Sequence, residues 1–310
     1  MNQDPVQHPA PRQTQSYLRE LFRCNGLFPK NKLGQNFLID LNLIDLLLRA
    51  GDLTRADLVL EIGTGTGSLT AKLADLAGAV LSVEIDPAFH DLAGGAVLGR
   101  NNVRLLLADV LKSKNQTNPE VLTALEELRA TYQPQRLKLI ANLPYAVATP
   151  VISNLLIAGV EVERMVVTVQ WEIAEKMIAK PGTKEYGALA ILVQSLADAE
   201  ILRKVAPTVF WPKPKVDSGI VLIKPNAQKR QQVPDVQRFR NFLRDLYSHR
   251  RKNLRGGLIS ATGNQHDKAA VDAKLAALGY AGTERAETLT IAQHVELCEA
   301  FQQHEAPKLA

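Results

Sequence analysis

The chain has 310 residues, 46% of them apolar and 22% charged, a composition typical of a globular protein with a sizeable core. No stretch approaches the roughly 18 consecutive apolar residues of a membrane span, and the polar N-terminus carries no secretory signal, so we expect a cytoplasmic protein with no membrane partner. Two isolated cysteines and six scattered histidines indicate neither a disulfide framework nor a metal site.

The net charge of +5 is unevenly distributed along the chain. Residues 203–257 contain 14 Lys and Arg against three Asp, a local charge of +11 that leaves −6 for the remaining residues. Positive charge concentrated in this way is what binding to a polyanion such as RNA requires. Charge alone leaves open a solvated surface whose long basic side chains cover apolar area.

The first predicted element is an N-terminal extension over residues 1–30, partly disordered because its first 15 or so residues are rich in Pro and Gln. From residue 58 onward, short β-rich runs alternate with helical stretches, which is typical of a parallel sheet with crossover helices. Strands are predicted at 58–63, 79–86, 103–109, 136–143, 164–170 and 219–224.

Two helical regions accompany these strands. Between the third and fourth strands, Leu122, Leu125 and Leu128 have the spacing of a surface helix, which we interpret as decoration within an insertion at 112–136. After Pro225 the apolar periodicity is helical only, and Thr290 with Gln293 predicts a capping box for a last helix. The expected division is therefore a sheet domain at 31–224 and a helical domain at 225–310.

Glycines and carboxylates follow three successive strands. Gly63 and Gly65 lie between a strand and a helix, where glycine lets a ligand approach the backbone. Glu84 ends the next strand and is suited to accept both hydroxyls of a ribose, and Asp109 ends the third, where it is suited to accept an adenine amine. The pattern indicates a nucleotide-type cofactor, either a dinucleotide or an adenosyl compound; for Glu84 the alternative is a carboxylate that stabilises a helix N-terminus.

The segment "IANLPYAVATP", residues 140–150, favours methyl transfer to an exocyclic amine. Such a nitrogen is planar, so it needs acceptors that hold its hydrogens and aim its lone pair. The Asn142 side-chain oxygen and the Leu143 carbonyl, fixed by Pro144, are candidate acceptors, and Tyr145 is a candidate for stacking on a base. The alternative is a turn punctuated by Asn and Pro with a packed tyrosine.

At this point the sequence resembles the ribosomal RNA adenine dimethyltransferase family, whose members convert two neighbouring adenosines near the 3′ end of 16S rRNA to N6,N6-dimethyladenosine. Eight stretches carry the resemblance, in family order across about 260 residues. They are "NKLGQNFLID", "LEIGTGTGSLT", "VEIDP", "NLPYAVATPVI", "VQWEIAEKMIAKPGTKEYGALAILVQ", "FWPKPKVDSGIV", "HRRKNLRGGL" and "RAETLTIAQ".

The resemblance implies an α/β fold, a Rossmann-like class I methyltransferase sheet with a small helical C-terminal domain, and S-adenosyl-L-methionine as cofactor. It implies cofactor contacts by Asn36, Leu38, Gly63, Gly65, Glu84, Asp109 and Asn142. The implied catalytic group is Asn142, Leu143, Pro144, Tyr145 and Phe210, with Phe210 flanking the base opposite Tyr145 unless it is a core residue. The resemblance also implies RNA contacts by five basic residues, Lys213, Lys215, Arg250, Arg251 and Lys252.

Departures from the family pattern are modest: the insertion after Asp109 is long, Thr64 and Thr66 replace the commoner Pro and a larger residue, and Asn253 stands where Thr is usual. The implied partner is 16S rRNA in the immature small ribosomal subunit, with the protein expected to act as a monomer. Rival interpretations are a large-subunit rRNA adenine methyltransferase of the macrolide-resistance type, a mainly non-enzymatic assembly factor and, more distantly, a nicotinamide dehydrogenase.

Overall fold

The computed structural model describes residues 13–158, 160–263, 265 and 267–301, so the disorder expected over the first 15 or so residues lies largely outside the described part. The chain divides into two compact units. The first comprises the described residues up to Ala174 together with Glu200–Pro225, and the second comprises Glu175–Ala199 and the described residues from Asn226 onward. Helix α7 (Trp171–Ile178) and strand β9 (Ala197–Val205) each contain a division point.

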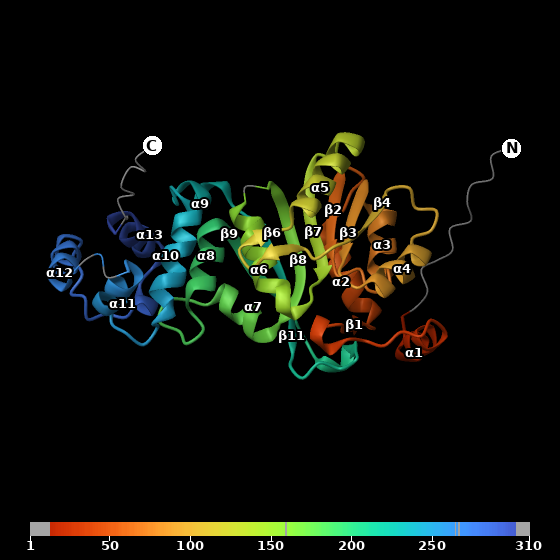
Figure 1. Cartoon of the computed structure of the whole chain (residues 1–310), viewed down its shortest axis with the longest axis horizontal. Helices are drawn as coiled ribbons and strands as arrows, with labels where there is room; N and C mark the ends of the chain where they lie inside the picture. Colours follow the sequence, from red (N-terminus) through yellow and green to blue (C-terminus); the bar gives the residue numbers. More distant parts are fainter. Residues whose placement is uncertain (1–12, 159, 264, 266, 302–310) are drawn as a thin grey trace. The chain divides into compact units, whose positions relative to one another are not determined.

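A seven-stranded sheet in the order β4-β3-β2-β7-β8-β11-β9 forms the centre of the first unit (Figure 1). Strands β4, β3, β2, β7 and β8 are parallel neighbours, and β11 is antiparallel to β8. Besides β9, the strands are β2 (Asp57–Ile62), β3 (Ala79–Glu84), β4 (Val103–Leu107), β7 (Arg136–Asn142), β8 (Val162–Gln170) and β11 (Ser218–Pro225). The α/β sheet predicted from the sequence is confirmed.

The order of these strands creates a switch point between β2 and β7. From β2 the chain proceeds outward to β3 and β4, then returns to β7 on the other side of β2 and continues to β8. Right-handed crossovers place the helices of the two halves on opposite faces of such a sheet, so a crevice opens at the carboxyl ends of β2 and β7. Topology alone therefore places a binding site at the ends of these two strands.

Five helices of this unit contact the sheet. They are α2 (Leu41–Gly51), α3 (Ser68–Leu76), α4 (Pro87–Ala96), α5 (Pro119–Tyr132) and α6 (Tyr145–Ile157). One buried cluster joins helices α2 and α3 to one face of the sheet. It contains Leu43, Ile44 and Leu47 of α2, Leu73 of α3 and alternate strand residues such as Val59. The alternation follows from the period of two along a strand, and because every residue of β2 and β3 is buried, the side chains on the opposite face are covered as well.

Helix α5 has a different role from the decoration expected from its sequence. It is the crossover that joins β4 to β7, it contacts β3, and Val121, Leu125 and Leu128 are buried. A parallel connection needs such a helix to return along the sheet, and burying its apolar face stabilises the fold. The segment before it forms a small hairpin of β5 (Leu111–Ser113) and β6 (Gln116–Thr117). The interpretation as decoration was therefore wrong for the helix.

A helix also forms within the predicted N-terminal extension. Helix α1 (Gln15–Cys24) is capped by the Thr14 hydroxyl and buries Leu18 and Phe22. These side chains pack with Phe37 and Phe89 in a separate apolar cluster. The chain then passes through the 3-10 turn Asn31–Leu33 to β1 (Phe37–Leu38), which pairs with β10 (Phe210–Trp211). A second 3-10 turn, Pro207–Val209, precedes β10.

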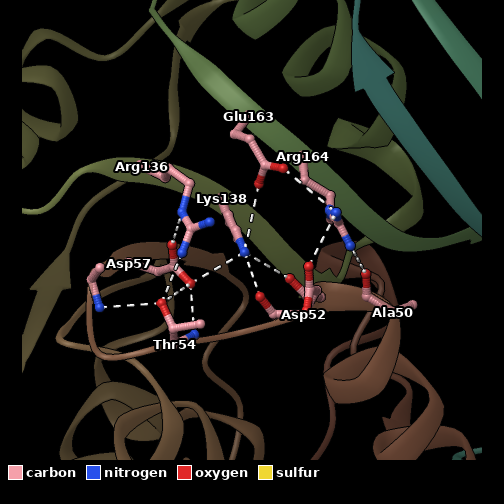
Figure 2. Close-up of polar contacts among 10 residues, drawn as sticks. Ala50, Asp52, Thr54, Asp57, Arg136, Lys138, Glu163 and Arg164 are labelled. Atoms are coloured by element: carbon pink, nitrogen blue, oxygen red, sulfur yellow. Dashed lines mark hydrogen bonds and ion pairs between the residues drawn. The ribbon is translucent and has the colours of Figure 1, made fainter.

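A buried polar cluster lies near the amino ends of the central strands, at the edge of the sheet opposite the crevice (Figure 2). The Lys138 side chain is fully buried, and its ammonium lies 3.1 Å from an Asp57 carboxylate oxygen and donates to the Asp52 carbonyl at 2.5 Å. Asp57 also accepts from Arg136 at 2.7 Å, and Glu163 lies 3.5 Å from Lys138. Burial by itself would raise the pKa of Asp57, but the hydrogen bonds from the Thr54 amide, Lys138 and Arg136, together with the Lys138 charge, hold it below its ordinary value.

The second unit is helical (Figure 1). Its helices and one 3-10 turn are α8 (Ala188–Leu196), α9 (Ala227–Gln231), α10 (Val236–Ser248), α11 (Leu254–Ala261), α12 (Lys268–Ala277), Ala286–Thr288 and α13 (Ile291–Ala300). Residues such as Leu246, Leu258 and Leu297 form its core. The capping box predicted for Thr290 and Gln293 is confirmed at the start of α13. Helix α8, from the middle of the chain, contacts both α10 and α13.

Candidate functional site

A cavity of about 260 Å³ lies at the carboxyl edge of the sheet, where the topology places a site. Its walls come from the segment before β1 and from the ends of β2, β3, β4 and β7. Six of the seven predicted cofactor residues line it, namely Asn36, Gly63, Gly65, Glu84, Asp109 and Asn142. Residues 106 positions apart in the sequence, Asn36 and Asn142, are therefore brought into one site.

The loop after β2 owes its shape to glycine. Gly63 has φ of +83° and Gly65 has φ of +57°, in the left-handed region that side chains rarely adopt. A Cβ on Gly63 would lie 3.2 Å from the Pro144 ring, and one on Gly65 would lie 3.1 Å from the Phe37 ring. The bare backbone lets this loop lie close to both the β7 loop and β1, so the cavity stays narrow.

Glu84 is held rigidly at the end of β3. One carboxylate oxygen accepts the Gly65 amide at 3.0 Å, and the other accepts the Ile85 and Asp86 amides at 3.0 and 2.9 Å. Burial raises the pKa of this carboxyl, and the three amide hydrogen bonds partly oppose that shift. A carboxylate has about four acceptor positions and these amides use three, so one position remains for a ribose hydroxyl, on the oxygen that accepts from Gly65.

Asp109 follows β4 and provides the other carboxylate of the cavity. It is exposed, and one of its oxygens accepts the Leu111 amide at 2.9 Å. Ile85, which is 46% exposed, and Val110 line the same cavity as these two carboxylates. An exposed isoleucine beside two carboxylates offers apolar contact for a flat ring whose edge groups bond to the acids.

Asn142 ends β7 with its amide orientation fixed. Its Nδ2 donates to the Asn36 carbonyl at 2.9 Å. A carbonyl can only accept, so the nitrogen must be the atom that faces Asn36, which leaves Oδ1 as the free acceptor of the amide. Asn142 lines the large cavity and also a smaller one of about 50 Å³ on the other side of the glycine loop. The structure thus presents an acceptor oxygen where the two cavities meet.

The residues after Asn142 have distinct positions. Leu143 has a buried side chain, Pro144 lines the large cavity, and Tyr145 begins helix α6. Tyr145 is half-buried, does not line the cavity and is anchored by a 2.6 Å hydrogen bond between its hydroxyl and that of Ser218. Burial raises the pKa of the Tyr145 phenol, so it stays neutral near pH 7. Sequence reasoning missed Ser218, which lies within the quoted "VDSGIV" stretch.

Neither Phe210 nor Leu38 lines the large cavity. Register pairs them across β1 and β10, and both side chains belong to the buried cluster beneath α2. Phe210 is 2% exposed and does not line the large cavity, so in this structure it is a core residue and not a wall for a base. Leu38 contacts only the smaller cavity. The stretch "FWPKPKV" gave no means of telling a core phenylalanine from one that flanks a base.

A buried network beneath the glycine loop was also missed. Glu61 is 1% exposed, and one of its oxygens accepts from the Thr70 hydroxyl at 2.5 Å and the Ser82 hydroxyl at 2.6 Å. Ser82 in turn lies 2.6 Å from the Thr64 hydroxyl. Burial raises the pKa of Glu61 to about 8. The only sequence signal was an acidic residue just before the glycine loop.

The predicted basic residues fall in both units. Lys213 and Lys215 are exposed after β10 in the first unit, and Arg251 is exposed in the second. Arg250 is largely committed to its own unit, because its guanidinium bonds to Glu287 at 2.8 Å and to the Tyr186 carbonyl at 3.0 Å. The fifth residue, Lys252, is also exposed, although its ammonium bonds to the Ser260 hydroxyl at 2.9 Å.

Two features are absent from the described residues. No three His, Cys, Asp or Glu side chains there are grouped as ligands of a metal ion. Nor is any helix in that part of the chain both long and apolar enough to cross a membrane.

The chain resembles known proteins in both sequence and structure. Residues 28–303 match the family described as "Ribosomal RNA adenine dimethylase". The "Ribosomal RNA small subunit methyltransferase A" of Ligilactobacillus salivarius (strain UCC118) is 37% identical over 91% of this chain and 93% of its own length. That of Pelotomaculum thermopropionicum is 36% identical over 92% of this chain and 95% of its own.

Solved structures share the fold. A dimethyladenosine transferase from Plasmodium falciparum superposes with a TM-score of 0.67 and 25% identity, covering 84% of this chain and 95% of that one. The 23S rRNA methyltransferase ErmE superposes with a TM-score of 0.57 and 24% identity, covering 86% of this chain and all of that one, a likeness of fold alone.

Proposed function

Because the chain belongs to the ribosomal RNA adenine dimethylase family, we propose that it methylates the N6 amines of two adjacent adenosines in the 3′-terminal hairpin loop of 16S rRNA. The product is N6,N6-dimethyladenosine at both positions, and the methyl donor is S-adenosyl-L-methionine. The observation that carries this proposal is the Asn142 amide, whose nitrogen is fixed on Asn36 and whose oxygen is left as an acceptor at the cavity.

The residues of the cavity fit the adenosyl part of this donor. Glu84 offers a rigid carboxylate with one remaining acceptor position for a ribose hydroxyl, and Asp109 offers an acceptor for the adenine amine. Ile85 and Val110 supply apolar surface for the ring between them. Gly63 and Gly65 keep the wall free of side chains where the donor passes the backbone. When bound, the donor supplies a methyl group on a positively charged sulfur.

The acceptor residues steer the target nitrogen. The Asn142 Oδ1 and the Leu143 carbonyl take the two amine hydrogens, which aims the nitrogen lone pair at the methyl carbon. Neither group needs to be a strong base, since the amine loses its proton only as the new bond forms. The Tyr145 ring stacks on the adenine, and the Ser218 hydroxyl keeps that ring in place.

The basic residues hold the RNA. Lys213 and Lys215, together with Arg251 and the other basic residues of 203–257, bind phosphates without reading sequence. The target adenine then leaves its stack, at a cost of a few kcal/mol, to enter the site. We propose that the substrate is the immature small subunit in the cytoplasm, that the protein acts as a monomer, and that residues 225–310 are its RNA-binding domain.

Labelled-methyl transfer tests the function. Small subunits lacking the modification are incubated with the protein and labelled S-adenosylmethionine, and their rRNA is digested to nucleosides. We expect label in N6,N6-dimethyladenosine at two neighbouring positions of 16S rRNA. Label confined to large-subunit rRNA would support the macrolide-resistance type of enzyme, and subunit binding without any transfer would support an assembly factor.

The Asn142→Ala variant tests the site. We expect turnover to fall by about 100-fold or more, as when a fixed polar group is removed from a transition state, while the Kd of S-adenosylhomocysteine changes little. Asn101→Ala, at an exposed asparagine before β4, is the matched control and should behave as wild type. Turnover of Asn142→Ala within a few fold of wild type would refute the assigned role.

A further inference from the structure

We propose that Gln13 binds the amino-acid end of the methyl donor and that helix α1 holds it in position. This inference rests on the proposed function, because it concerns the same donor. It adds a binding residue from a segment that lies before all of the family motifs quoted above.

Gln13 is a buried polar side chain at the edge of the described chain. It is 5% exposed, its Nε2 donates to the Thr66 hydroxyl, and it lines the smaller cavity of about 50 Å³. Burying an amide is costly unless its polar groups are bonded, so a glutamine in this position indicates polar partners. Thr66 is itself one of the departures from the family pattern, and it provides the hydroxyl that Gln13 bonds.

The smaller cavity shares part of its wall with the larger one. The two share Phe37, Gly63, Gly65 and Asn142 as walls, whereas Glu84 lines only the larger. A donor whose ribose bonds Glu84 and whose methyl lies at Asn142 extends its remaining part, the amino acid, past Asn142 and the glycine loop. That path leads into the smaller cavity, which Gln13 lines.

The chemistry of the smaller cavity suits a zwitterion. The amino-acid end carries an ammonium group, which needs acceptors, and a carboxylate, which needs donors. The Gln13 carboxamide has both kinds of atom, and the Thr66 hydroxyl can donate or accept. Bonds to charged groups are stronger than those between neutral ones, so this pair can favour the complete donor over one without its amino acid.

Helix α1 fixes Gln13 at its start. Thr14 caps the helix directly after Gln13, and Leu18 and Phe22 anchor it in an apolar cluster. The Phe22 ring packs edge-on against Phe37 with centroids 5.1 Å apart, and Phe37 is the residue that contacts the glycine loop. The helix therefore determines the position of Gln13 and supports one wall of both cavities.

Two ligands distinguish a Gln13 that binds the amino-acid end from a Gln13 that only supports the glycine loop. S-adenosylhomocysteine carries the amino-acid end, and 5′-methylthioadenosine has the same nucleoside without it. Isothermal titration of Gln13→Ala should show roughly tenfold weaker binding of S-adenosylhomocysteine and unchanged binding of 5′-methylthioadenosine. Gln15→Ala, at an exposed glutamine two residues later, is the matched control and should leave both affinities unchanged.

The outcomes are distinct. Equal weakening of both ligands by Gln13→Ala would mean that Gln13 only supports the loop, and unchanged binding of S-adenosylhomocysteine would mean that it has no role; either result overturns the proposal. If the alanine variant proves unfolded by its melting curve, Gln13→Met takes its place, because it keeps the length of the side chain and removes both polar groups of the amide. If the wild-type protein binds neither ligand, the cofactor assignment itself is overturned. If the wild-type protein binds both ligands and Gln13→Ala binds them equally well, only this inference is defeated.

Discussion

Replacing Glu61 by Gln should remove a pH dependence from the stability of the protein. Glu61 is buried beneath the glycine loop, and burial raises its pKa from an ordinary 4.5 to about 8, with the nearby charge of Glu84 adding to the shift. The hydroxyls of Thr70 and Ser82 bond to the carboxylate and oppose the shift without cancelling it. In the folded protein the proton is therefore held more tightly than in the unfolded chain.

The sign and size follow from this difference in proton binding. The stabilising contribution of the protonated Glu61 is fully present below about pH 4.5 and is lost as the pH rises towards 8. Within that window the free energy of unfolding falls by up to roughly 1.4 kcal/mol per pH unit because of this group. Between pH 5.5 and 7.5 the loss attributable to Glu61 is thus on the order of 3 kcal/mol.

Urea denaturation at these two pH values measures the effect. The wild-type protein and Glu61→Gln share every other titrating group, so the difference between their two pH responses isolates Glu61. We expect the variant to lose about 3 kcal/mol less than the wild type between pH 5.5 and 7.5. Equal losses in the two proteins would refute the raised pKa and the account of the network.

Three other perturbations have defined outcomes. Lys138→Met should lower the free energy of unfolding by about 3–5 kcal/mol in urea titrations, because it leaves the buried Asp57 carboxylate without its ammonium partner. The control, Lys72→Met, removes a surface ion pair with Asp45 and should lower it by under about 1 kcal/mol. Ser218→Ala should lower kcat several-fold with unchanged S-adenosylhomocysteine binding, since it frees the Tyr145 ring; a normal kcat would argue against the anchor. Glu84→Gln should weaken both S-adenosylhomocysteine and 5′-methylthioadenosine about tenfold by calorimetry, and unchanged affinities would exclude a ribose contact.

Local patterns in the sequence predicted much of the fold. The strands around Gly63, Glu84 and Asn142 were predictable because apolar runs, glycines and polar strand ends lie within a few residues of one another. Parallel strands bring such ends to one edge, so the cavity residues were expected together before the structure was known. Their roles towards donor and base stay predictions until the variants are measured.

What depends on distant pairing was not predictable. Phe210 is buried because its short strand pairs with Phe37 and Leu38, more than 170 residues earlier, and no local pattern contains that register. Helix α5 looked like decoration because its role as a crossover depends on the order of β4 and β7 in the sheet. Gln13 and Ser218 gave no signal because a single polar residue acquires its meaning only from the neighbour that the fold provides.

The second unit is assembled from two separate pieces of chain, and this affects the order in which it can form during synthesis. Helix α8 leaves the ribosome before α10 and α13, the helices that it contacts, have been translated. The contacts that α8 makes with α10 and α13 can form only after those helices have emerged. Nascent chains paused before residue 236 should therefore present the apolar helix α8 without α10 and α13, and we expect a chaperone at the exit tunnel to bind it.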